Sequence, residues 1–135
     1  MIRKRVLDVG QCGPDHAAIC RLLEGTFGAE VEQADRLDDA LAALRRSAFD
    51  LVLVNRKLDI DYSDGIEIVR AIKADAALAA TPVMLVTNYP EHQQAAIAAG
   101  AEPGFGKAEL ALPQTRERLT RFLSANREGR APSPG

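Results

Sequence analysis

Hydrophobic and polar positions follow two different periodicities along this chain. Short apolar runs rich in β-branched residues, too short to form helices, predict strands that are buried on both faces. The clearest runs are Leu51 to Val54 and Pro82 to Thr87. Weaker runs predict strands over Val6 to Val9, Val31 to Ala34 and Glu102 to Gly106.

Segments with apolar residues three and four positions apart separate these runs and predict amphipathic helices. The predicted helices cover Pro14 to Glu24, Leu37 to Leu44, Ile66 to Lys73, Pro90 to Ala99 and Leu112 to Leu123. Strands that alternate with helices form parallel sheets, because each right-handed crossover places a helix on one face. The pattern therefore predicts an α/β fold, a flavodoxin-like doubly wound sheet of five parallel strands.

The size and the ending of the chain predict one domain followed by a tail. A chain of 135 residues with 47% hydrophobic content can bury a core of its own. We expect this domain to span residues 1–124. Residues 125–135 contain no apolar residue larger than alanine, so we expect a disordered tail.

Charge and composition exclude several classes of protein. The net charge of −2 and the pI near 5.7 provide no basic field for nucleic acid. No apolar run approaches the ~20 residues that a membrane helix needs, and Asp8 and Gly10 interrupt the N-terminal stretch too early for a signal peptide. Two cysteines are too few for a disulfide scaffold. We expect a soluble, cytoplasmic protein without a nucleic-acid or membrane partner.

Asn55 directly follows a predicted buried strand. The carboxyl edge of an open α/β sheet is where ligands and chemistry collect. A carboxylate in this place could attack phosphorus, whereas an uncharged amide cannot. The residue at position 55 therefore decides which chemistry the edge supports.

Several motifs resemble the receiver domain of bacterial two-component response regulators, over roughly residues 4 to 124. They occur in the family's order, namely Phe49 to Asn55 (similar to "DLVLLD"), Leu58 with Asp64 and Gly65 ("MPxxDG"), Pro82 to Thr87 ("PVIMLT"), and Ala99 to Ala101 with Lys107 ("aGAxxyltK"). The resemblance implies a signalling domain rather than an enzyme. It also implies that Thr87 is the switch hydroxyl and Lys107 the lysine that binds a phosphoryl group.

The departures from the family pattern concern its chemistry. Gly10 and Gln11 replace the two acidic residues that hold Mg²⁺ in the family, and Asn55 replaces the aspartate that accepts the phosphoryl group. Gly104 stands at the aromatic switch position and Ala108 replaces a proline. Because Mg²⁺ requires negatively charged oxygen ligands, we expect no metal, no cofactor and no phosphorylation, which defines a pseudo-receiver.

The two remaining pocket residues are expected to stabilise one fixed state. Lys107 would hydrogen-bond Asn55 or a loop carbonyl, or pair with Asp8 or another nearby acid. Asp8 lies within an apolar strand, where an ionised carboxylate needs a partner. Its side chain would reach the cleft, or meet Lys4, Lys107 or solvent.

The resemblance also implies an interaction surface made of the fourth helix, the fifth strand and the fifth helix. Here that surface offers Tyr89, the alanine-rich helix and a basic stripe of Arg116, Arg118 and Arg121. An ordinary solvated helix surface is the alternative. No DNA-binding segment follows, so we expect a protein partner in trans, such as a histidine kinase or an effector, and a monomer or weak homodimer.

Two other functions remain open. A displaced acceptor, Asp8, Asp59 or Asp61, would rebuild an atypical phosphoacceptor site, although Asp64 is expected to serve as a helix N-cap. Alternatively, Gly10 to Gly13 would cradle the phosphate of a nucleotide or flavin at a helix start.

Cys12, His16 and Cys20 are spaced four residues apart. Zinc would need a fourth ligand, and Gly13 and Pro14 interrupt a continuous helix. We therefore expect buried cysteines and a surface histidine. Cys12 precedes a helix N-terminus, which favours a redox-sensitive thiol.

Overall fold

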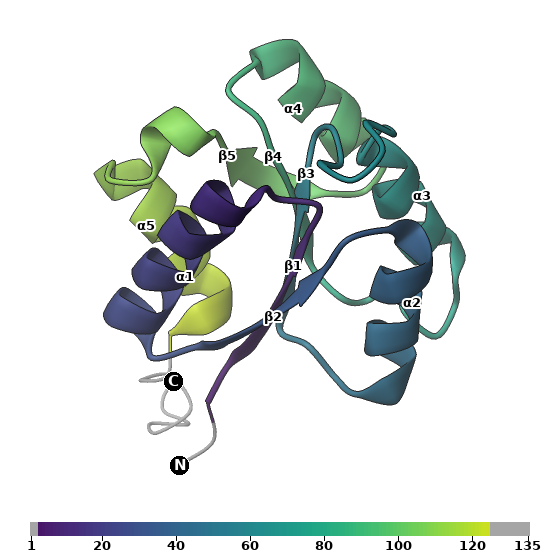
Figure 1. Ribbon diagram of the computed structural model, residues 1–135, viewed down its shortest axis with the longest axis horizontal. Coiled ribbons are helices and arrows are strands. Elements are labelled where there is room, and N and C mark those ends of the chain that lie inside the picture. Colours follow the sequence, from purple (N-terminus) through teal and green to yellow (C-terminus); the bar gives the residue numbers. More distant parts are fainter. Residues whose placement is uncertain (1–2, 125–135) are drawn as a thin grey trace.

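The computed structural model describes residues 3–124, and the predicted tail at 125–135 lies outside the described residues. Strands and helices alternate along the chain (Figure 1). In order, the elements are β1 (Arg5–Val9), α1 (Gly13–Phe27), β2 (Glu30–Ala34), α2 (Leu37–Arg46), β3 (Leu51–Asn55), α3 (Ile66–Ala74), β4 (Val83–Val86), α4 (Pro90–Ala98), β5 (Glu102–Phe105), the 3₁₀ turn η1 (Lys107–Glu109) and α5 (Pro113–Leu123).

The strands form one parallel sheet in the order β2-β1-β3-β4-β5. Helices α1 and α5 lie on one side of it, and α2, α3 and α4 lie on the other (Figure 1). The predicted flavodoxin-like fold is confirmed. The carboxyl ends of β1, β3 and β4 meet at the edge where the sequence places Asn55.

Two hydrophobic layers hold the helices on the sheet. Side chains such as Ile19, Leu119 and Phe105 fill the layer under α1 and α5. Val9 and Ile68 belong to the layer under α2, α3 and α4. Every residue of β3 from Leu51 to Val54 is at 0% exposure, as expected of a central strand buried on both faces.

The start of α3 differs from the prediction that Asp64 is its N-cap. Gly65 is the N-cap and makes no side-chain cap hydrogen bond. The Asp64 carboxylate instead pairs with Lys57, at 2.6 Å between Oδ1 and Nζ. A Cβ at position 65 would lie 2.0 Å from the carbonyl oxygen of Asn55, so the close approach of α3 to β3 requires glycine.

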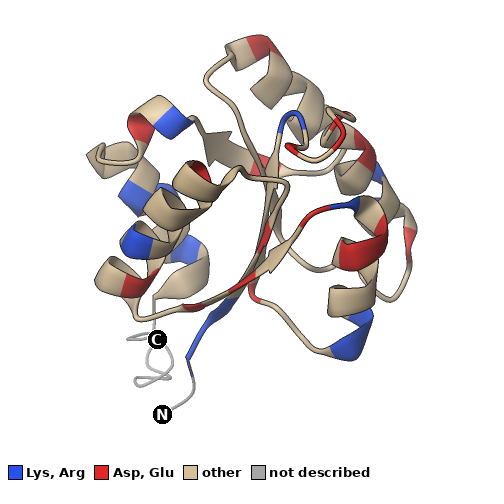
Figure 2. Cartoon of the chain, viewed as in Figure 1, with Lys and Arg blue, Asp and Glu red and all other residues tan. Residues whose placement is uncertain are grey.

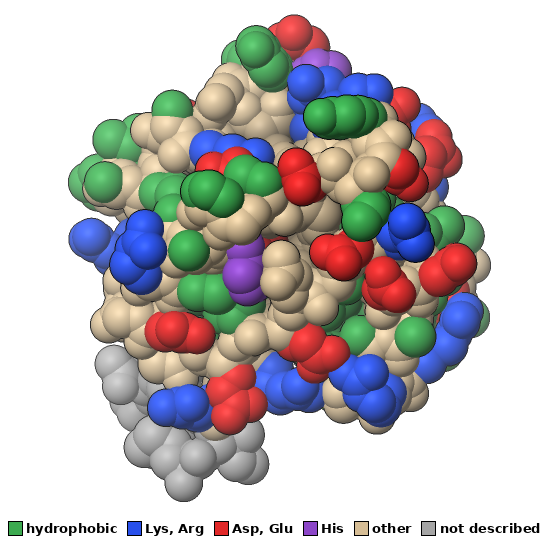
Figure 3. Space-filling view, viewed as in Figure 1, with side chains coloured by type: hydrophobic (Ala, Val, Ile, Leu, Met, Phe, Trp, Pro, Cys, Tyr) green, Lys and Arg blue, Asp and Glu red, His purple; other side chains and the backbone are tan. Residues whose placement is uncertain are grey.

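Charges are distributed over the surface without one dominant sign. In α2, acids at the start and arginines at the end complement the helix dipole (Figure 2). Acidic and basic side chains are interspersed on the face shown in Figure 3. Among the described residues, no helix is long and apolar enough to cross a membrane.

Candidate functional site

A shallow cavity of about 200 Å³ opens at the carboxyl edge of the sheet. It is lined by Asn55, Arg56, Lys57, Val86, Thr87, Asn88, Tyr89 and Lys107. The structure thus brings together the three residues that the sequence assigns to this pocket, Asn55, Thr87 and Lys107, from the ends of β3, β4 and β5. The lining contains three cationic side chains and no carboxylate.

The amide of Asn55 is a hydrogen-bond donor within the fold. Its Nδ2 donates to the carbonyl oxygens of Lys57, at 2.7 Å, and Gly10, at 3.2 Å. Both partners are acceptors, so the orientation of the amide follows from the network. The side chain therefore ties the loop after β3 to the loop after β1. A carboxylate in the same place would direct its oxygens at two carbonyl oxygens.

An apolar side chain occupies the space next to Gly10. The φ of Gly10 is +80°, and a Cβ at this position would lie 2.4 Å from Cδ2 of Leu58. Leu58 is 2% exposed, and the neighbouring Asp59 amide donates to the Gly10 carbonyl at 2.9 Å. The loop after β3 therefore folds back over β1 and fills the place of an acidic side chain at position 10.

The residues present do not fit a magnesium ion. Gln11 is 3% exposed, and neither atom of its amide group has a hydrogen-bond partner within the described residues. Gly10, Gln11 and Asn55 together bring no negative charge, which a hard divalent cation requires. Over residues 3–124, no group of three or more His, Cys, Asp or Glu side chains is placed to hold a metal.

Lys107 is held by an acid on α1. Its Nζ lies 2.6 Å from Oδ2 of Asp15, in the first turn of that helix. This hydrogen bond lowers the pKa of Asp15. Cys12 donates its thiol to the same carboxylate oxygen at 3.2 Å. The sequence left several partners open for Lys107, and the structure shows that the partner is an acid other than Asp8, namely Asp15. Lys107 therefore links the end of β5 to α1.

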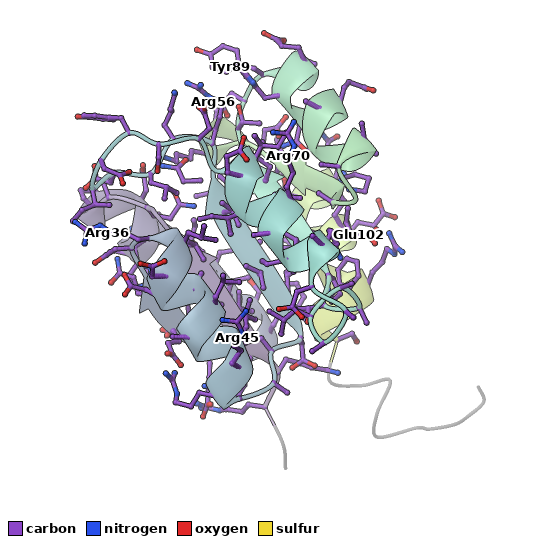
Figure 4. All side chains as sticks on the ribbon, turned by 90° about the vertical axis from the view of Figure 1, so that its right-hand side faces the viewer. Arg36, Arg45, Arg56, Arg70, Tyr89 and Glu102 are labelled. Atoms are coloured by element: carbon purple, nitrogen blue, oxygen red, sulfur yellow. The ribbon has the colours of Figure 1, made fainter. Side chains whose placement is uncertain are left out.

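Thr87 and Tyr89 form the turn between β4 and α4. Thr87 is 7% exposed, and its Oγ1 accepts a hydrogen bond from the backbone N–H of Tyr89 at 3.2 Å. The ring of Tyr89 is half exposed and lies edge-on to His92. The guanidinium of Arg56 lies 5.7 Å from the centre of the tyrosine ring, and Figure 4 shows the two side chains at the same end of the molecule.

The aromatic switch position is closed by backbone contacts. A Cβ at Gly104 would lie 2.3 Å from the carbonyl oxygen of Leu85 on β4. The Gly104 N–H donates to Oε1 of Gln93 at 3.0 Å. The Nε2 of Gln93 donates to the carbonyl oxygens of Leu85, at 2.9 Å, and Thr87, at 3.3 Å. One glutamine therefore fastens α4 to β4 and β5.

Asp8 lies beneath α1, at 0% exposure, and does not line the cavity. Its Oδ2 is 2.6 Å from Nδ1 of His16, while its Oδ1 has no hydrogen-bond partner among the described residues. Burial raises the pKa of Asp8 to about 6, although the hydrogen bond to His16 and the charges of His16 and Lys107 act in the opposite direction. The expectation of a surface histidine is wrong, because the His16 side chain is 20% exposed and covers this carboxylate.

The other two acids considered as displaced acceptors lie on the exposed loop after β3. Asp61 accepts hydrogen bonds from the backbone and hydroxyl of Ser63, and these bonds lower its pKa. Asp59 is also exposed. Neither carboxylate lines the cavity.

The arginines of α5 do not form one stripe. Arg118 donates to the Gly104 carbonyl, and Arg121 lies 3.6 Å from Glu102, so both face β5. Arg116 projects roughly 160° away from Arg118 around the helix. Arg118 also lines a groove of about 250 Å³ between α4, β5 and α5, together with Gln93, Ile97, Pro103 and Gln114.

The sheet order, with Asn55, Thr87 and Lys107 gathered at its carboxyl edge, is that of a receiver-type signalling domain. Residues 15–109 match the response regulator receiver domain, and the chain belongs to this family. It is therefore a receiver domain of two-component signalling.

Individual proteins are similar to this chain in sequence or in fold. The chain is 30% identical over 115 residues to a gliding motility regulatory protein of Myxococcus xanthus, a match that covers 78% of this chain and only 14% of that protein. The chemotaxis protein CheY4 of Vibrio cholerae superimposes with a TM-score of 0.68 at 26% identity, covering 90% of this chain and 97% of the other. For a putative response regulator of Chloroflexus aurantiacus the TM-score is 0.74 at 18% identity, with 90% and 98% covered.

Sequence reasoning missed some contacts that shape the site. The pairing of Lys107 with Asp15 and the packing of Leu58 on Gly10 join residues far apart in the chain, and no local pattern marks them. The spacing of His16 and Cys20 was a usable signal, since four residues place two side chains on one helix face. Asp8, the partner of His16, was visible only as an acid within an apolar strand.

Proposed function

We propose that this receiver domain works without phosphorylation, as a module that binds a protein partner in trans. The observation that carries the proposal is the double hydrogen bond that Asn55 donates to the carbonyls of Gly10 and Lys57. The fold uses position 55 as a donor, a role that an ionised aspartate cannot fill. The partner would be a histidine kinase or an effector protein.

The surroundings of Asn55 support the same conclusion. The cavity lining has no carboxylate that could attack phosphorus or bind a divalent cation. Lys107, which would contact a phosphoryl group, is paired with Asp15. The domain would therefore present one constitutive state to its partner.

The two alternatives have less support. Asp8 is buried under α1, and Asp59 and Asp61 are exposed on a loop, so none of the displaced acceptors lies in the cavity. A phosphate cradle at the start of α1 would meet the Asp15 carboxylate in the first helical turn.

The surface formed by α4, β5 and α5 is the proposed contact region. It contains the groove beside Gly104 and the exposed side chains of Tyr89 and Arg121. Charges at the rim of an interface act mainly through screened attraction, so their loss changes the association rate and its salt dependence. The chain alone would be a monomer or a weak homodimer.

Incubation with acetyl phosphate and Mg²⁺ tests whether the domain accepts phosphate. We expect the intact mass of the protein to stay unchanged. Phosphorylation that persists in Asn55→Ala and disappears when Asp8, Asp59 or Asp61 is replaced by alanine would overturn the proposal and identify a displaced acceptor.

A pull-down from cell extract, with the bound proteins identified by mass spectrometry, tests the contact surface. We expect Arg118→Glu with Arg121→Glu, both on the side of α5 that faces β5, to weaken capture of a partner and Lys107→Ala to leave it unchanged. Arg45→Glu on α2 is the matched control, because it reverses a similar charge on the other side of the sheet. Capture that is lost in Lys107→Ala and unaffected by the arginine changes would place recognition in the cleft.

A further inference from the structure

A half-buried arginine directly after β3 has no hydrogen-bond acceptor for its side chain among the described residues. Over residues 3–124 the half-buried arginines are Arg5, Arg56 and Arg118. The guanidinium of Arg5 donates to a serine and a glutamate, and that of Arg118 donates to a backbone carbonyl. The guanidinium of Arg56 makes no hydrogen bond or ion pair within residues 3–124 and lies 5.7 Å from the centre of the Tyr89 ring. Its five N–H groups can therefore bind an acceptor from another molecule.

An apolar pocket opens beside this arginine, between α3 and α4, which lie side by side on the face that Figure 4 turns toward the viewer. The volume of this α3–α4 pocket is about 230 Å³, and it is lined by Arg56, Asp64, Ile66, Leu85, His92 and Ala95. Leu85 is 2% exposed and belongs to the core, so the floor is hydrophobic. Since a cavity of roughly 150 Å³ can hold benzene, the α3–α4 pocket has room for a large apolar side chain.

The charges on the rim of the α3–α4 pocket favour a ligand with one negative charge. The Asp64 carboxylate lies 2.6 Å from Nζ of Lys57. The hydrogen bond from Lys57 lowers the pKa of Asp64, and the charges of Arg56 and His92 act in the same direction. Two fixed positive charges, on Arg56 and Lys57, thus face one carboxylate. A further carboxylate balances them, whereas a doubly charged phosphate would leave an excess of negative charge beside Asp64.

We propose that the α3–α4 pocket binds a segment of a partner protein in which an aspartate or glutamate is adjacent to a large apolar residue. The apolar side chain fills the space over Leu85. The carboxylate of the partner forms paired hydrogen bonds with the guanidinium of Arg56, which the Tyr89 ring supports. Arginine and tyrosine beside an apolar pocket are typical of the residues that contribute most of the binding energy at protein interfaces.

This inference deepens the proposed function, because it rests on a protein partner and names the chemistry of the segment that is bound. The α3–α4 pocket differs from the groove beside Gly104. His92 and Ala95 of α4 line the pocket, whereas Gln93 and Ile97 of the same helix line the groove. Helix α4 therefore has one contact region toward α3 and another toward α5.

The test measures binding of blocked dipeptides to the full chain by NMR. The probes are N-acetyl-Leu-Glu-amide and the reversed sequence N-acetyl-Glu-Leu-amide. In two comparison peptides, glutamine replaces the glutamate or alanine replaces the leucine. Backbone shifts of Arg56, Ile66, His92 and Ala95 report on the pocket. We expect saturable shifts with a Kd of about 1 mM for at least one probe, and binding at least about fivefold weaker for each comparison peptide.

Variants locate the binding within the pocket. Arg56→Gln removes the charge and should weaken the glutamate probe at least about fivefold without affecting the glutamine peptide. Arg36→Gln is the control, since Arg36 is exposed and lies away from Arg56 in Figure 4. Ala95→Leu fills the pocket and should weaken both peptides. Ala98→Leu, also exposed on α4 but outside the pocket lining, should not.

Inorganic phosphate is the probe for charge alone. Phosphate binding as tight as that of the glutamate probe, equal binding of the glutamate and glutamine peptides, or no saturable shift with either probe at about 10 mM would overturn the proposal. The acetyl phosphate experiment fails separately. A domain that is phosphorylated and binds a probe contradicts only the proposed function, and one that is not phosphorylated and binds no probe contradicts only this inference.

Discussion

At the scale of single residues, the two protons on the Asn55 amide nitrogen connect the loops around the cleft. Asn55→Asp keeps the size of the side chain and removes both donors to Gly10 and Lys57. We expect this variant to lower the free energy of unfolding by about 1–3 kcal/mol, because two carbonyl oxygens then face a carboxylate. Urea unfolding at pH 7 measures the effect.

Asn88→Asp is the matched control for this prediction. The Oδ1 of Asn88 accepts a hydrogen bond from the backbone of Ala108 at 3.1 Å, and an aspartate can accept the same bond. We expect this variant to be close to wild type. An Asn55→Asp protein as stable as wild type would mean that the two donor bonds do not hold the loops.

A second residue-scale prediction concerns the buried carboxyl of Asp8. Its pKa rises from 3.8 to about 6 on folding, so the folded protein binds this proton more tightly than the unfolded chain does. Stability from this group is therefore fully present below about pH 4 and is lost as the pH rises to about 6. The shift corresponds to about 3 kcal/mol.

Asp8→Asn removes this titration. We compare the stability of the variant with that of wild type at two pH values. We expect the difference, variant minus wild type in free energy of unfolding, to be about 2–3 kcal/mol larger at pH 7 than at pH 4. Carboxyls with lowered pKa values, such as Asp15 and Asp64, have the opposite pH dependence but are common to both proteins. A difference that stays constant between the two pH values would contradict the raised pKa.

At the scale of elements, the loop after β3 is packed on β1 through Leu58 and Gly10. We expect Gly10→Ala to cost about 1–3 kcal/mol, because the residue has positive φ and its new methyl group would overlap Leu58. Gly13→Ala is the control, since nothing lies within 4 Å of its Cβ position. Thermal unfolding of both variants tests the difference, and equal melting temperatures would contradict the close contact.

The same packing affects any attempt to rebuild a metal site. Aspartates at positions 10, 11 and 55 supply the missing charge, but the first of them has no room beside Leu58. We expect the variant with Gly10→Asp, Gln11→Asp and Asn55→Asp to bind Mg²⁺ measurably only when Leu58→Ala is added. The readout is the rise in melting temperature with Mg²⁺ over an NaCl control of equal ionic strength. A clear rise in Asn55→Asp alone would mean that Asp8 supplies charge to the site.

The elements themselves were largely predictable, and their ends and contacts were not. Continuous apolar runs predicted β3 and β4 because a central strand has no solvated face. The extension of α1 to Phe27 and the N-cap at Gly65 depend on local backbone contacts that a periodicity does not contain. Asn55 was predicted to lie at the carboxyl edge of the sheet, and the resemblance to the receiver family implied that Thr87 and Lys107 share its pocket. The partners of these residues required the tertiary structure.

At the scale of the whole molecule, Gln93 connects α4 to the sheet. We expect Gln93→Ala to lower the free energy of unfolding by about 1–3 kcal/mol, because it leaves the Gly104 N–H and two carbonyls without this partner. Hydrogen exchange of the α4 amides should become faster. Gln94→Ala on the exposed side of the same helix is the control. Unchanged exchange in Gln93→Ala would show that packing alone holds α4.

The attachment of α4 through Gln93 has a consequence for how such a domain conveys information. In the constitutive module proposed above, a helix fastened to two strands, beside a glycine that has no side chain to rotate, would offer a partner the same surface at all times. The occupancy of the partner would then depend on how many copies of the domain the cell contains. Synthesis and degradation of the protein, rather than a change in its shape, would set the strength of the signal.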